Sequence, residues 1–164
     1  MDSDAGNALG MRRNLEILVA DQYPRVATDL LAPVLELLRL SRDHFGGDID
    51  KFLVMLVVGL RTTRRPTAAG AAPRPRAGDE PRILPGLGTN ARSIADSLQM
   101  PKETVRRKVC DLIEAGWLAR RNSKLYVTST AYQQFTPLRE QIERLAIDHY
   151  EVVAALQTHA AACG

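Results

Sequence analysis

Residues 93–128 read SIADSLQMPKETVRRKVCDLIEAGWLARRNSKLYVT, and this stretch decides the fold. Apolar residues recur at helical spacing on both sides of Pro101, which predicts two short helices separated by a turn. The apolar positions are Ile94, Ala95 and Leu98 in the first helix and Val105, Val109, Leu112 and Ile113 in the second. Packed against one another, these side chains form a small helical core.

The flanking residues support these boundaries. Thr89 is predicted to cap the first helix, and Pro101 suits the first turn of the second. Gly116 suits the position just after the second helix, where a left-handed residue is common.

Short strand candidates surround the two helices. Residues 117–119 and 125–127 are predicted to form a hairpin, joined by a polar turn over residues 120–124 in which Asn122 tolerates positive φ. Residues 82–84 are a further short strand candidate before a Pro-Gly turn. Helix, turn, helix and hairpin in this order predict a winged helix-turn-helix.

Cations concentrate in the second helix and the hairpin. From Pro101 to Lys124 there are seven Lys or Arg against three acids, a net charge of +4, whereas the whole chain carries +3. If the apolar positions of the second helix face inward, its outward positions are Lys102, Glu103, Arg106 and Arg107. In a helix that enters the major groove, Lys or Arg can donate to guanine and Glu can accept from cytosine N4.

The stretch resembles the winged helix of bacterial transcription regulators over about residues 92–128. PKETVRRKV, residues 101–109, is similar to the recognition helix of the Crp/Fnr family, and the IADSL and LIEAGWL segments resemble the MarR and GntR families. The resemblance implies that Lys102, Glu103 and Arg107 read bases. It further implies that Thr104 contacts phosphate and that Arg106 stands at a less constrained position. Nothing upstream resembles a cyclic-nucleotide β-roll, so no effector of that kind is implied.

We therefore expect a DNA-binding surface in which helix 101–115 lies in the major groove and wing 119–125 contacts the backbone or minor groove. Its predicted residues are Arg92, Ser93, Lys102, Glu103, Thr104, Arg106, Arg107, Arg120, Arg121 and Lys124. Lys108 need not share this face with Arg107, because successive helical residues point about 100° apart. The alternative is that these cations are only solvated and that the winged helix is a protein–protein interaction module, an adaptor or assembly subunit without DNA binding.

The chain upstream of this stretch is predicted to be helical. Helices are expected over residues 9–20, 24–43 and 49–62, with Pro33 kinking or splitting the second and Asp48 capping the third. Residues 63–82 are rich in Pro, Ala, Gly and Arg and are predicted to be a flexible loop. Its PRPR segment, residues 73–76, resembles an AT-hook core, although a proline replaces the glycine between the arginines.

A long C-terminal helix is predicted from Thr136 toward Ala161, with apolar residues alternating four and three apart as in a heptad seam. The seam residues are Leu138, Ile142, Leu145, His149, Val152 and Leu156, followed by His159. One interpretation is a dimer interface that places two winged helices on a two-fold operator. The alternative is that the seam packs against the N-terminal helices of the same chain. Those helices are also candidates for the dimer interface.

The expected fold class is mainly α with a small β-hairpin: a winged helix-turn-helix with N-terminal helices and a long C-terminal dimerisation helix. The expected domains are residues 1–47, 48–128 and 129–164. The sequence predicts a homodimeric, sequence-specific DNA-binding transcription regulator whose partners are double-stranded DNA and a second copy of itself. It names no effector ligand.

Several other classes of protein are disfavoured by composition and motifs. The most apolar run, FLVMLVVGL, has nine residues, whereas a membrane span needs about 20, so a cytoplasmic protein without a membrane partner is expected. Two distant cysteines and three scattered histidines predict no disulfide framework, metal site or cofactor. Nucleotide-binding and hydrolase motifs are missing, so we expect no enzyme.

Overall fold

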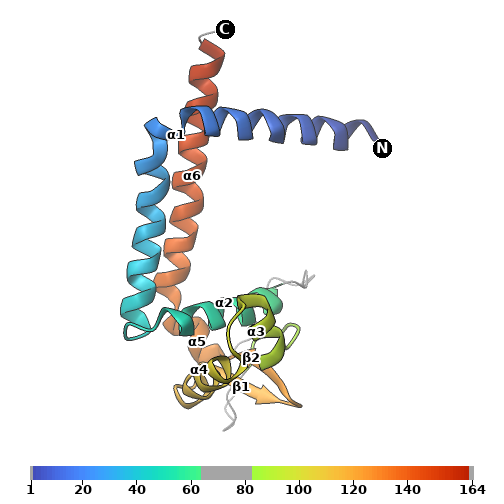
Figure 1. Cartoon of the computed structure of the whole chain (residues 1–164), viewed down its shortest axis with the longest axis vertical. Helices are drawn as coiled ribbons and strands as arrows, with labels where there is room; N and C mark the ends of the chain where they lie inside the picture. Colours follow the sequence, from blue (N-terminus) through green and yellow to red (C-terminus); the bar gives the residue numbers. More distant parts are fainter. Residues whose placement is uncertain (1, 64–82, 163–164) are drawn as a thin grey trace. The chain divides into compact units, whose positions relative to one another are not determined.

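The computed structural model describes residues 2–63 and 83–162 (Figure 1). The elements in chain order are α1 (Asp2–His44), α2 (Ile49–Thr63), α3 (Ala91–Leu98), α4 (Lys102–Glu114), β1 (Leu118–Arg121), β2 (Lys124–Val127), α5 (Ser129–Gln134) and α6 (Thr136–Ala162). The predicted fold class is confirmed: the chain is mainly α with one small antiparallel hairpin, consistent with a winged helix. The predicted loop and its PRPR segment lie outside the described residues, apart from Thr63 at the end of α2.

The chain divides into two compact units. Unit 1 consists of residues 1–39 and 138–164, and unit 2 consists of residues 40–137. Unit 2 holds the helix-turn-helix and the hairpin, and unit 1 holds most of the two longest helices. The domain boundaries predicted at residues 47 and 128 stay a prediction. Among the described residues, no helix combines the length and the apolar character that a membrane crossing requires.

Unit 1 departs from the prediction of separate N-terminal helices, because α1 is continuous from Asp2 to His44 with Pro24 and Pro33 inside it. Figure 1 shows α1 bent between its dark-blue first part and its lighter-blue second part, which lies beside α6. A proline lacks the N–H that would close the helical turn, so bending at such positions is expected. In the turn before Pro33, the Leu30 carbonyl accepts a hydrogen bond from His149 Nε2 of α6, at 2.9 Å. This contact between helices helps to stabilise the helix where proline weakens it.

Unit 2 is built around α2, which packs against α3, α4 and β2. The sequence of α2 is apolar on most sides because three neighbours cover it. Fully buried side chains from these elements form the core: Val54, Val58, Ile94, Val105, Val109 and Leu112. Each such side chain contributes about 1.5–3 kcal/mol relative to exposure, so the apolar spacing alone fixes which faces of α3 and α4 turn inward. The predicted helical core is therefore present, although Leu98 is only half-buried.

The hairpin pairs β1 with β2 in antiparallel register, with Leu118 opposite Val127 and Arg121 opposite Lys124. The turn is shorter than the predicted five residues. It contains only Asn122 and Ser123, whose φ angles are 46° and 62°, the pattern of a two-residue turn that matches strand twist.

A segment before α3 covers the other edge of β2. Ile83 bridges Thr128, and Thr89 bridges Leu125. The predicted strand at residues 82–84 is thus reduced to a single bridge among the described residues. Between the bridges, Gly88 lies so close to β2 that an added Cβ would be 2.5 Å from Tyr126 Cζ. The added Cβ would also be 2.8 Å from Lys124 Cβ, so any side chain at this position would force its neighbours on β2 to move.

The short helix α5 was not predicted. Thr128 caps it, since its Oγ1 accepts a hydrogen bond from the Ala131 amide at 3.1 Å. The same hydroxyl donates to the Gly116 carbonyl at 2.7 Å. One buried threonine therefore starts α5 and ties it to the end of α4.

Candidate nucleic-acid interface

The N-terminal turns of α4 present a charged face to solvent. Val105 and Val109 are fully buried on one side of the helix. The residues on the opposite side are exposed, as predicted from the spacing: Lys102, Glu103, Arg106 and Arg107. Thr104 is half-buried beside this face. Their exposure makes the polar ends of all four long side chains accessible to a ligand.

Both ends of α4 are fixed by local sequence. Pro101 precedes the first turn, where its missing N–H costs nothing. At the other end, Gly116 has φ of 74°, its amide donates to the Ile113 carbonyl, and the Trp117 amide donates to the Leu112 carbonyl, both at 2.9 Å. This pair of bonds is the Schellman motif that glycine allows. Helix α4 therefore begins and ends within one residue of the predicted bounds, 101 and 115.

The start of α3 differs in one respect from the prediction. The cap is Asn90, whose side-chain oxygen accepts from the Ser93 amide at 2.9 Å, and not Thr89. Thr89 is buried because its backbone pairs with Leu125 of β2, so it lies one residue too early to cap the helix. Arg92 is exposed in the first turn, and Ser93 is half-buried.

The hairpin adds a second set of exposed cations. Arg120, Arg121 and Lys124 are all exposed. They lie in β1 and β2, next to the Asn122–Ser123 turn, and not in a loop as predicted. Strand positions hold these side chains more firmly than a loop, because the ladder fixes the backbone on both sides of the turn.

Two of the exposed residues of α4 bind each other. Arg106 Nε lies 2.9 Å from Glu103 Oε2, and Arg106 Nη2 lies 2.7 Å from Glu103 Oε1. The hydrogen bond from Arg106 is the largest of the effects that lower the pKa of Glu103, and the nearby charge of Arg107 adds to them. Glu103 is thus an acid paired with a cation among the exposed, otherwise cationic residues of these first turns.

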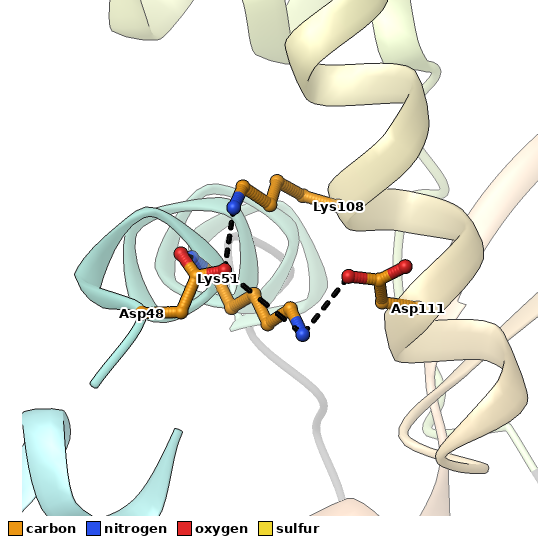
Figure 2. A network of polar contacts seen from close by, with 4 residues as sticks. All are labelled: Asp48, Lys51, Lys108 and Asp111. Carbon is orange, nitrogen blue, oxygen red and sulfur yellow. Dashed lines mark hydrogen bonds and ion pairs between the residues drawn. The ribbon is translucent and has the colours of Figure 1, made fainter. Parts of the chain in front are cut away.

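Lys108 has a different role from its neighbours in sequence. Figure 2 shows it reaching from α4 to Asp48 at the start of α2, with Nζ 2.5 Å from Oδ2. Its side chain is only 13% exposed. Beside this pair, Lys51 Nζ lies 2.9 Å from Asp111 Oδ2 and 3.9 Å from Asp48 Oδ2. Two lysines and two aspartates thus connect α2 to α4, and Lys108 does not share the exposed side of the helix with Arg106 and Arg107.

The Asp48–Lys108 pair is the part of the site that the sequence did not reveal. Asp48 was predicted only as a cap, and its Oδ1 does lie 3.4 Å from the Lys51 amide. Its partner Lys108 is 60 positions away, and no local pattern links positions so distant. Burial raises the pKa of Asp48. The hydrogen bonds and charges of Lys108 and Lys51 lower that pKa by a larger amount, so the net shift is downward.

An aromatic cluster lies behind the hairpin in unit 2. The rings of Trp117 and Phe135 are 5.0 Å apart, and His44 stacks on Trp117 at 5.6 Å. Phe45 contacts all three. His44 Nε2 is buried, and the described residues offer it no hydrogen-bond partner. Burial lowers the pKa of His44.

The predicted seam of α6 is only partly covered within one chain. Leu138 and Leu156 are buried, whereas Ile142 is exposed and Gln141 is buried in its place. Gln141 is three positions after Leu138 and four positions before Leu145. It can therefore share the inward face of α6 with these two leucines, just as Ile142 was predicted to do. Leu145, His149 and Val152 are half-buried.

Comparison with known proteins adds little. No protein-family model and no curated protein matches the chain. Among solved structures, the chain is similar to AbfR of Staphylococcus epidermidis, with 16% identity and a TM-score of 0.41. The match covers 94% of this chain and 99% of AbfR. So distant a likeness carries no conclusion about function, which has to come from the residues themselves.

Proposed function

We propose that this protein is a sequence-specific DNA-binding transcription regulator that acts as a homodimer. Helix α4 enters the major groove, and the hairpin contacts the backbone or minor groove. The observation that carries the proposal is the distribution of cations: Lys102, Arg106 and Arg107 on α4 are exposed together with the cations of the hairpin. Lys108 forms an ion pair with Asp48 at the start of α2, and the proposal assigns it no contact with DNA.

The roles divide by chemistry. Lys102 and Arg107 are assigned to guanine edges, and Glu103 to a cytosine amine, because they occupy the N-terminal turns that reach base edges. Arg92, Ser93 and Thr104 are assigned to phosphates, together with the hairpin cations. Phosphate contacts position the protein and supply salt-dependent affinity, whereas base contacts supply specificity.

Dimerisation is proposed through unit 1. A single chain leaves large apolar side chains of this unit in water: Leu31, Leu35 and Leu38 on α1, and Ile142, Ile147 and Tyr150 on α6. The three leucines follow one another at intervals of four and three, so they share one face of α1. Large apolar side chains exposed along one helix face are typical of a protein interface. The predicted seam residues Leu145, His149 and Val152 retain enough exposure to border it.

The test of DNA binding is titration of random duplex DNA across a salt series. Affinity should fall steeply as salt rises, with a slope set by the number of phosphates contacted. Replacing Lys102 and Arg107 together by alanine should remove about 1–3 kcal/mol per lost base contact at specific sites. The control replaces Arg13 and Arg144, two exposed cations of unit 1, and should leave base preference unchanged. Wild-type protein that binds no duplex at low salt contradicts the proposal.

Dimerisation has a separate test. Sedimentation at micromolar concentration should give the mass of two chains. Replacing Leu35 by lysine should yield monomers that bind a half-site more weakly than the dimer binds a full site. A wild-type monomer at that concentration contradicts this part of the proposal and leaves DNA binding by unit 2 open to its own test.

A protein–protein interaction module remains the second candidate. Tyr132 and Leu60 of unit 2 are exposed apolar residues that such a module could use. An adaptor has no need of cations on both α4 and the hairpin, so the salt series separates the two candidates.

A further inference from the structure

The exposed face of the first two turns of α4 contains one acid among cations. Glu103 is the single carboxylate in the first two turns, residues 102–109. Arg106 donates to both of its oxygens, with Nε at 2.9 Å from Oε2 and Nη2 at 2.7 Å from Oε1. Both side chains are well exposed, 76% for Glu103 and 67% for Arg106, so burial does not explain the pairing.

The geometry leaves part of the carboxylate available. A carboxylate has about four acceptor sites, and a two-pronged arginine contact uses those on one edge. The remaining lone pairs of Glu103 can still accept from a donor in front of the helix. In the major groove, the exocyclic N4 amine of cytosine is the base-edge donor that glutamate pairs with.

An unpaired Glu103 would be disfavoured beside phosphates, because like charges repel each other at the distances of a groove contact. The guanidinium of Arg106 offsets that charge and also restricts where the carboxylate points. Arg106 therefore changes both the cost of bringing Glu103 into the groove and its direction once there.

We propose that Arg106 is a positioning residue for base recognition, which holds the Glu103 carboxylate so that its free edge accepts from a cytosine amine. The inference rests on the proposed DNA binding and its assignment of Glu103 to cytosine, and it adds a positioning role for Arg106. Arg106 then contributes to specificity at one base pair, through Glu103, and its loss should change base preference more than affinity for all sequences.

A direct phosphate contact by Arg106 makes the opposite prediction. Loss of such a contact weakens binding to every sequence about equally and lowers the salt slope by about one unit. Base preference separates the two roles, because a contact to phosphate carries no sequence information.

The experiment selects binding sites from a random duplex library with the full-length protein and its variants. The variants are Glu103→Gln, Arg106→Ala, Arg106→Lys, the double variant Glu103→Gln/Arg106→Ala, and Arg120→Ala as a control on the hairpin. Wild type is expected to prefer cytosine at one position. Glu103→Gln and Arg106→Ala should each reduce the cytosine preference at that position about 5-fold or more. A 5-fold loss corresponds to the lower end of the discrimination that one base contact supplies.

The combined variants test whether the two residues act together. Glu103→Gln/Arg106→Ala should lose no more cytosine preference than Glu103→Gln alone, since Arg106 acts through the carboxylate. Arg106→Lys should restore only part of the preference, because an ammonium lacks the two-pronged geometry. Arg120→Ala should weaken binding to all sequences and leave the preference intact.

The outcomes distinguish this inference from the proposed function. If wild type binds DNA but Arg106→Ala lowers affinity uniformly with cytosine preference intact, Arg106 contacts phosphate and the inference is wrong. Wild-type binding without any cytosine preference also overturns it, and both results leave DNA binding standing. Failure of wild type to bind any duplex at low salt overturns the proposed function and this inference together.

Discussion

Breaking the contact between Asp48 and Lys108 should loosen α4 from α2. The relevant variants are Lys108→Ala, Asp48→Ala and the double variant. Lys108→Ala leaves Asp48 with Lys51 Nζ at 3.9 Å, whereas Asp48→Ala also removes the contact with the Lys51 amide at 3.4 Å. Asp48→Ala is therefore expected to be the more destabilising of the two single changes.

The magnitude follows from burial. Exposed ion pairs are worth about 0.2–1 kcal/mol, and hydrogen bonds to charged groups about 1.5–3 kcal/mol. Lys108 is 13% exposed and Asp48 is 24% exposed, so their pair lies between these two cases. We expect a coupling energy of about 1–2 kcal/mol in the double-mutant cycle, which corresponds to a shift of roughly 0.5–1 M in the urea midpoint.

Tryptophan fluorescence is the natural assay. The chain has a single tryptophan, Trp117, and it lies in the aromatic cluster of unit 2. Urea unfolding followed by fluorescence therefore reports on the unit that contains the ion pair. The exposed Glu103–Arg106 pair on the same helix is the matched control, and its cycle should give a clearly smaller coupling.

The pH dependence gives an independent check. The pKa of Asp48 is lowered in the folded protein. The carboxylate therefore contributes stability that is fully present above the ordinary pKa of an aspartate and is lost as pH falls through the lowered pKa. A coupling energy near zero at neutral pH, or one no larger than that of the control pair, would refute the reasoning that partial burial strengthens the Asp48–Lys108 contact.

Four further changes have defined outcomes. Gly88→Ala should cost about 1–3 kcal/mol, seen as a lower urea midpoint, because its Cβ would overlap Tyr126. Gly116→Ala should lower the free energy of unfolding by about 1–2 kcal/mol, because alanine is strained at a φ of 74°, and the urea midpoint measures this loss. Asn90→Ala should lower stability by about 1 kcal/mol through loss of the α3 cap, and an unchanged midpoint would contradict the capping role. Burial lowers the pKa of His44 in the folded protein, so the neutral ring contributes its full stability above its ordinary pKa, and this stability declines as pH falls from there through the lowered pKa. His44→Phe should therefore make the stability of unit 2 depend less on pH between about pH 7 and pH 5.

Much of unit 2 could be predicted because its signals are local. The spacing of Val105, Val109 and Leu112 fixes the inward face of α4, and Gly116 marks its end. The hairpin follows from Asn122, which adopts the left-handed conformation that the turn requires. These features need no information from distant parts of the chain.

The features that were not predicted depend on distant residues or on weak local patterns. Lys108 finds Asp48 only once the chain is folded, and no sequence period connects them. The six residues of α5 carry too few apolar positions for a period, and its cap Thr128 is also consistent with the end of a strand. Pro33 was expected to kink or split its helix, and α1 continues through it, which rules out the split. The contact of the Leu30 carbonyl with His149 joins residues 119 positions apart, which no local pattern indicates.

The division into two units also sets the order in which the chain can fold as it is synthesised. Residues 40–137 form one uninterrupted segment, whereas unit 1 is assembled from both ends of the chain. At about 5–20 residues per second, the ribosome needs roughly 5–20 s to pass from Arg39 to Leu138. During that interval unit 2 can fold, while the half-buried Leu30, whose carbonyl bonds His149 in the folded chain, has no α6 nearby. The nascent chain therefore carries α1 without α6 for several seconds, which exposes α1 to chaperones and to premature association with another nascent copy.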